Sequence, residues 1–115
     1  MGIRVCKFGG SSVADAGQLR KVRAIVEDRD DRRFVVPSAP GRRFPHDMKV
    51  TDLLYRCHEA VSKGQPIETI FGQISERFCK IVSDLGLDFD LDGALGEIHD
   101  QIRDDAGAAL SLIHI

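Results

Sequence analysis

Lys7, Gly9, Gly10, Ser11 and Ser12 form the first cluster of residues whose types and spacing could bind a ligand. Glycines allow positive φ angles and let a ligand approach backbone N–H groups, while lysine offers a mobile positive charge. At the end of a strand and the start of a helix, such a cluster predicts a phosphate-binding turn. It is not the G-x-x-x-x-G-K-[ST] loop, because the lysine precedes the glycines. The alternative is a glycine turn beside a surface lysine.

The second cluster is Ser38-Ala39-Pro40-Gly41, which also follows an apolar run. In parallel α/β sheets, ligands bind beyond the carboxyl ends of the strands. We therefore expect this cluster to share one crevice with the first. A simple Pro/Gly turn is the alternative.

The third cluster, residues 49–54 (KVTDLL), stands where an amphipathic helix is expected to begin. The hydroxyl of Thr51 and nearby N–H groups could bind a small anionic substrate. Thr51 or Asp52 could instead be a helix cap, and the residue types alone favour the cap.

The elements that must position these clusters follow from the hydrophobic pattern. Residues 3–8 predict a buried strand, and residues 34–36 predict a second strand that Pro37 stops. Between them, apolar residues spaced by three and four predict a helix that fades within residues 27–33. Ser12 and Asp15 resemble a capping box at its start. A strand, a helix and a strand within about 35 residues indicate a βαβ unit with parallel pairing.

The remainder of the chain predicts three helices. Their apolar faces cover residues 50–61, 67–85 and 91–102, with Pro66 in the first turn of the second helix and Gly86 as its stop. A sheet of only two strands is marginal, so further strands are expected beyond the sequence given. Residues 111–115 are expected to be either a processing scar or the start of the next strand.

Composition excludes several classes of protein. A chain of 115 residues with 43% hydrophobic and 30% charged residues is typical of one soluble globular domain. The net charge of −2 and the mixing of basic with acidic residues give no general attraction for nucleic acid or anionic lipid. Three scattered cysteines and four histidines lack metal-ligand spacing. No apolar run reaches the ~20 residues of a membrane span, so a cytoplasmic location is expected.

Taken in order along one chain, the three clusters resemble the aspartate kinase family within the amino acid kinase fold. Residues 7–15 (KFGGSSVAD), 35–41 (VVPSAPG) and 49–55 (KVTDLLY) carry the resemblance. It implies an α/β fold, namely the N-terminal part of a three-layer αβα sandwich with a mainly parallel sheet. Residues 1–110 would form the N-terminal, substrate-side portion of the catalytic domain.

The resemblance also implies a function for the full-length parent. It would phosphorylate L-aspartate to 4-phospho-L-aspartate with ATP and Mg²⁺, the first step toward lysine, threonine and methionine. Lys7 would stabilise the transferring phosphoryl group, and the backbone of Gly9, Gly10 and Ser11 would bind it. Ser38 and Thr51 would contact aspartate. No metal-ligating residue is implied, and the parent would be a homo-oligomer that binds neither nucleic acid nor membrane.

The sequence also departs from the family pattern. A Ser-Arg-Gly-Glu segment, the nucleotide-binding half and the regulatory domains have no counterpart in it. Residues 42–47 form a somewhat elongated loop that is similar to one subgroup of the family. A truncated chain, inactive by itself, is therefore expected. Two alternatives stay open: another amino acid kinase, against which the KVTDLL segment argues, and a non-catalytic helical module with residues 67–85 as its partner surface.

Overall fold

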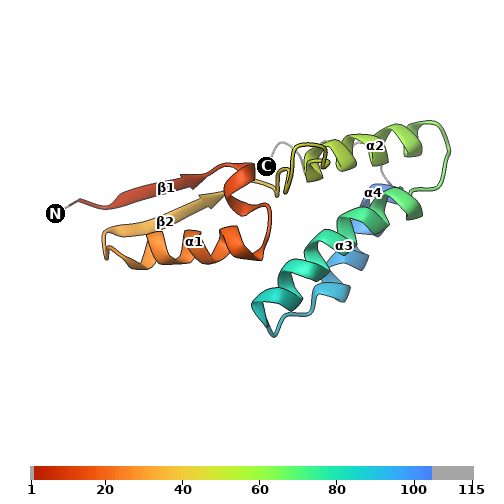
Figure 1. Cartoon of the computed structure of the whole chain (residues 1–115). Helices are drawn as coiled ribbons and strands as arrows, with labels where there is room; N and C mark the ends of the chain where they lie inside the picture. The colour runs from red at the N-terminus through yellow and green to blue at the C-terminus, as the bar shows by residue number, and fades with distance from the viewer. Residues whose placement is uncertain (1, 105–115) are drawn as a thin grey trace. The chain divides into compact units, whose positions relative to one another are not determined.

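The computed structural model describes residues 2–104, which form two compact units that divide between Lys49 and Val50. The first unit contains a parallel two-stranded sheet and one long helix, and the second contains three helices (Figure 1). The chain is thus a mixed α/β protein, as the sequence pattern predicted.

The first unit is a strand–helix–strand unit. Its elements are β1 (Arg4–Phe8), the short 3-10 helix η1 (Gly10–Val13), α1 (Ala16–Glu27) and β2 (Arg32–Pro37). The strands pair in parallel, with Val5 opposite Phe34 and Lys7 opposite Val36. This pairing confirms the predicted βαβ arrangement.

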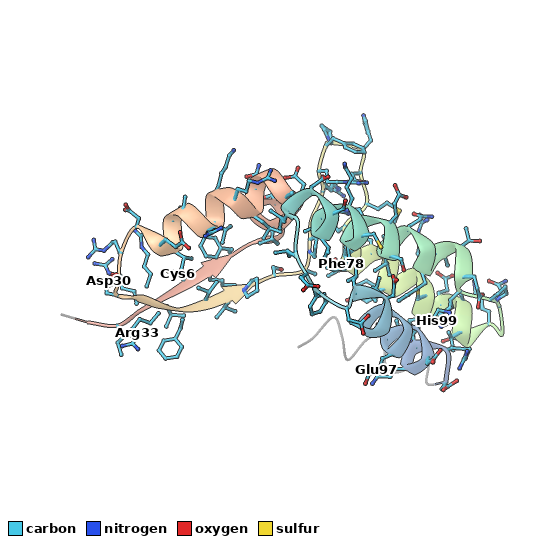
Figure 2. All side chains as sticks on the ribbon, turned by 90° about the horizontal axis from the view of Figure 1, so that it is seen from below. Cys6, Asp30, Arg33, Phe78, Glu97 and His99 are labelled. Atoms are coloured by element: carbon cyan, nitrogen blue, oxygen red, sulfur yellow. The ribbon has the colours of Figure 1, made fainter. Side chains whose placement is uncertain are left out.

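The prediction that residues 3–8 form a buried strand is wrong in one respect. Cys6 lies on the sheet face that α1 covers (Figure 2). Residues of the opposite face stay open, with Val5 67% and Phe34 57% exposed. An apolar run predicts cover on both faces of a sheet, whereas α1 is the one α-helix within the described residues of the first unit.

The second strand is longer than residues 34–36. It starts at Arg32 and includes Pro37, so proline is its last residue and does not stop it. Proline is tolerated there because the next residue resumes the hydrogen bonding, with the Ser38 N–H donating to the Phe8 carbonyl at 2.9 Å. The register shifts between the Arg4 and Val5 pairs, and one extra residue of β2 is accommodated there.

The start of α1 also differs from the prediction. Asp15 is the N-cap, and its Oδ1 accepts a hydrogen bond from the Gln18 N–H at 2.9 Å. Ser12 lies earlier, within η1, and its N–H donates to the Gly9 carbonyl at 3.1 Å. The predicted capping box is therefore wrong, because the 3-10 turn occupies Ser12 and delays the α-helix to Ala16.

The second unit consists of α2 (Val50–Ser62), α3 (Glu68–Leu85) and α4 (Leu91–Asp104), each of which packs against the other two. The three predicted helices are confirmed. Pro66 is not in the first turn of α3, because Ile67 is the N-cap and the helix begins at Glu68. The buried apolar side chains of this unit are those of Val50, Leu53, Leu54, Cys57, Ala60, Ile67, Phe71, Ile74, Ile81, Leu95 and Ile102.

Gly86 ends α3 in the left-handed conformation, with φ 65° and ψ 36°. The N–H of Gly86 donates to Ser83 and the N–H of Leu87 to Val82, so the last carbonyls of the helix are satisfied. The predicted stop at Gly86 is confirmed.

Two further predictions concern the C-terminal residues and membrane-spanning helices. Residues 111–115 lie outside the described residues, so their assignment stays a prediction. Within residues 2–104, no helix has both the length and the apolar character needed to cross a membrane.

Gly86→Ala should lower the free energy of unfolding by about 1–2 kcal/mol, because a side chain at positive φ is strained. Gly72, inside α3, has open space around its Cβ position, so Gly72→Ala is the matched control and should be neutral or stabilising. Urea unfolding of both variants tests this. Equal effects would contradict the proposed role of the left-handed cap.

Candidate functional site

The loops that follow β1 and β2 lie side by side. Because the strands are parallel, both loops start at the same edge of the sheet. The Gly41 N–H donates to the Gly10 carbonyl at 2.8 Å, so the second loop is hydrogen-bonded to the first. The two clusters adjoin, and the ligand crevice that they would share stays a prediction.

The two loops approach so closely that side chains are excluded. A Cβ on Gly41 would lie 2.7 Å from the carbonyl carbon of Gly10. A Cβ on Gly10 would lie 3.1 Å from the Ala39 carbonyl oxygen. A Cβ on Gly9 would meet nothing within 4 Å. Glycine is therefore required at position 41, tightly packed at position 10, and not required by the chain itself at position 9.

The expected reason for the glycines was partly wrong. Gly9 has φ −73°, and within residues 2–104 positive φ occurs only at Gly64 and Gly86. Gly10 thus serves the close approach of two backbones instead of a left-handed turn. The space at the Cβ position of Gly9 is open.

Lys7 and Ser38 stand at the carboxyl ends of the two strands. Lys7 is the fourth residue of β1, is exposed, and shares the sheet face of Val5, opposite the face that α1 covers. Ser38 follows β2 directly and is exposed. The sheet therefore brings these two predicted site residues to one edge.

The sequence pattern predicted that the glycines lie at the N-terminal, partly positive end of a helix, and the structure differs. The Asp15 carboxylate caps α1, so a negative charge already occupies that N-terminus. The backbone that follows the glycines directly is the 3-10 turn η1, and Gly9 at its start makes no side-chain cap. Any anion bound by the glycine loop would face η1 and not the first turn of α1.

Thr51 belongs to the second unit. The helix α2 begins at Val50, so Thr51 and Asp52 are part of its first turn and neither is the cap. The Thr51 side chain is half-buried. Its contact with a substrate stays a prediction.

Residues 42–47, after the second loop, are closed by an arginine–aspartate clamp. The Arg43 guanidinium donates to the Asp47 carboxylate at 2.6 and 3.0 Å, and the Arg43 N–H donates at 3.0 Å. The Arg42 Nε donates to the Asp47 carbonyl at 3.1 Å. The hydrogen bond from Arg43 holds the pKa of Asp47, whose side chain is only 9% exposed, well below its usual range. The spacing of four residues was the only sequence signal for this clamp.

Other reactive groups have structural explanations. Cys57 is fully buried, and burial raises the pKa of its thiol to about 11, so the thiol stays protonated at neutral pH.

Arg4 and Arg29 both pair with Asp31 around a shallow groove at the amino ends of the strands. That groove lies at the opposite end of the sheet from the glycine loops. No group of three His, Cys, Asp or Glu residues within residues 2–104 could hold a metal ion.

The sequence and the fold were compared with those of known proteins. The sequence is 39% identical to aspartokinase 3 of Bacillus subtilis (strain 168) over 104 residues, which is 90% of this chain and 21% of that protein. The fold matches the crystal structure of Clostridium acetobutylicum aspartate kinase with a TM-score of 0.91 and 40% identity. The chain is related to the aspartate kinases. That second match covers 95% of this chain and 26% of the other.

A further aspartate kinase structure supports the relationship. E. coli aspartokinase III, in complex with aspartate and ADP, matches with a TM-score of 0.70 and 28% identity over 93% of this chain and 22% of that one. No family model matches the sequence. The chain thus spans about a fifth to a quarter of the length of the aspartate kinases that it matches. The predicted resemblance is confirmed, and the fold is that of one segment of these enzymes.

The Asp47 clamp should make stability depend on pH. Because the pKa of Asp47 is lowered on folding, its contribution is present above the ordinary aspartate pKa of about 3.9 and is lost as the pH falls below it. The difference in unfolding free energy between wild type and Asp47→Asn should be constant from about pH 7 to pH 5 and shrink below about pH 4. Asp88→Asn, at an exposed acid in the loop after α3, is the control. An unchanged difference at about pH 3 would contradict the clamp.

Proposed function

We propose that this chain supplies the phosphate-binding loop and part of the aspartate site of an aspartate kinase. Such an enzyme transfers the γ-phosphoryl group of ATP to the β-carboxylate of L-aspartate, giving 4-phospho-L-aspartate for lysine, threonine and methionine synthesis. One observation carries the proposal. The hydrogen-bonded loops after β1 and β2 hold Lys7 and Ser38 at one sheet edge, in a fold that superposes on an aspartate kinase.

Lys7 is the residue that we assign to the phosphoryl group. Its ammonium is a compact charge that can follow a phosphoryl oxygen as the group moves between donor and acceptor. The backbone N–H groups of Gly9, Gly10 and Ser11 would bind the same group. The open space around Gly9 supports this role, because the chain itself gives no reason for a glycine there.

Ser38 and Thr51 are the residues that we assign to aspartate. Each offers a hydroxyl that can donate to a carboxylate oxygen. Phosphoryl transfer needs little covalent chemistry from the protein, so these contacts would act by orienting the β-carboxylate for in-line attack. The Mg²⁺ that accompanies ATP would neutralise charge on the phosphates.

This chain matches only a small fraction of the length of the aspartate kinases, and this limits what we expect it to do alone. It matches 21–26% of their length, so we expect this segment to hold only part of an active site. The complete enzyme would be a cytoplasmic homo-oligomer. The helical-module alternative gains no support, because Phe71, Ile74 and Ile81 of α3 are buried and not displayed as a partner surface.

Activity should appear only when the segment is placed in a complete enzyme. The 115-residue chain should form no aspartyl phosphate, measured by hydroxylamine trapping. When residues 4–104 replace the matching segment of B. subtilis aspartokinase 3, the hybrid enzyme (the graft) should form aspartyl phosphate. In the graft, Lys7→Ala should lower kcat about 10²–10³-fold, because it removes a charge that stabilises the transition state.

The exposed Lys21 of α1 is the matched control, and Lys21→Ala should leave kcat unchanged. Full turnover by the Lys7→Ala graft would overturn the assignment of Lys7. Turnover by the 115-residue chain would overturn the claim that it holds only part of the site.

A further inference from the structure

We infer that Gly41 is a positioning residue of the phosphate-binding loop, acting through Gly10 and Ser11. The inference rests on the proposed function for the purpose of that loop, but its geometry is independent of any ligand. Gly41 itself need not touch a substrate. Its lack of a side chain lets the loop after β2 fix the backbone of the loop after β1.

The contact is between two backbones. The Gly41 N–H donates to the Gly10 carbonyl at 2.8 Å. A Cβ at position 41 would lie 2.7 Å from the Gly10 carbonyl carbon, 3.0 Å from its oxygen and 3.0 Å from the Ser11 nitrogen. All three are main-chain atoms, which cannot rotate away as a side chain can. By contrast, a Cβ on Gly93 would meet the Asp90 carboxylate, the end of a side chain that can turn aside.

The loop after β2 makes hydrogen bonds on both sides of Gly41. Its first residue, Ser38, is tied to Phe8 by a 2.9 Å hydrogen bond. On the other side of Gly41, Arg42 and Arg43 are held by Asp47. A side chain at position 41 could move its own loop only against these hydrogen bonds, so we expect the Gly10 and Ser11 backbone that it meets to shift.

The backbone of the loop after β1 has open space on one side. A Cβ on Gly9 meets nothing within 4 Å, so the chain before Gly10 is not packed against other atoms on that side. A shift of Gly10 and Ser11 would turn the N–H groups that we assign to the phosphoryl group. Gly41→Ala should thus weaken phosphate binding without unfolding the sheet.

The first test needs no ligand. In the 115-residue chain, amide exchange followed by ¹H–¹⁵N NMR should show a protected Gly41 N–H. In Gly41→Ala, that protection should be lost and the amide peaks of residues 10–12 should move, while the Ser38 N–H of the strand ladder stays protected. Gly17→Ala in α1, where the Cβ would make an ordinary 3.5 Å contact, is the control and should change none of these.

The second test uses inorganic tripolyphosphate as the probe. In wild type it should shift the amide peaks of Gly9, Gly10 and Ser11. Gly41→Ala should raise the apparent Kd about tenfold at an equal folded fraction, an effect that a purely structural role would not produce. Gly9→Ala should weaken binding while the Gly41 N–H stays protected, because it blocks the ligand without moving the loop.

The outcomes separate the two proposals. If tripolyphosphate moves no amide in wild type, the proposed phosphate loop is wrong, and the ligand-free peaks still decide the role of Gly41. An unprotected Gly41 N–H in wild type, or a Gly41→Ala variant with unmoved peaks at residues 10–12 or unchanged affinity, overturns the inference. If Gly41→Ala does not fold, Gly10→Ala replaces it, since its tightest contact of 3.1 Å is milder and should move the same peaks less.

Discussion

The parallel pairing of β1 with β2 is the constraint on which the candidate site depends. It places the loops after both strands at one edge of the sheet, where the Gly41 N–H reaches the Gly10 carbonyl at 2.8 Å. An antiparallel pair would send the two loops to opposite ends, and Lys7 and Ser38 would then not share an edge. The connection through α1 makes the parallel arrangement possible, because parallel strands need a crossover of a dozen or more residues.

The glycine loop departs from a simple helix N-terminus. Asp15 satisfies the start of α1, so the backbone nearest Gly9 and Gly10 is the 3-10 turn η1. A carboxylate at that cap disfavours a second anion at the start of α1. The uncovered sheet face around Val5 and Phe34 has another cause, because α1, the one α-helix within the described residues of the first unit, covers the opposite face.

How well the sequence predicted each element depended on whether its cause was local. The helices of the second unit follow from apolar spacing and from Gly86, and both signals act within a few residues. Ser12 was mistaken for a cap because several polar residues near a helix start are chemically able to cap it, and the 3-10 turn decides among them. Pro37 was mistaken for a stop because the hydrogen bond from Ser38 to Phe8 joins residues far apart in sequence.

The sequence by itself determined the order of Lys7, the glycine pair, Ser38 and Thr51 along the chain, and through that order the relationship to the aspartate kinases. These features are covalent and local, so no fold is needed to see them. Only the tertiary structure decided that Gly41 packs on Gly10, and that Asp15 and not Ser12 caps α1. The contact of Gly41 with Gly10 is made across strands that pair only when the chain folds, so spacing along the sequence could not reveal it.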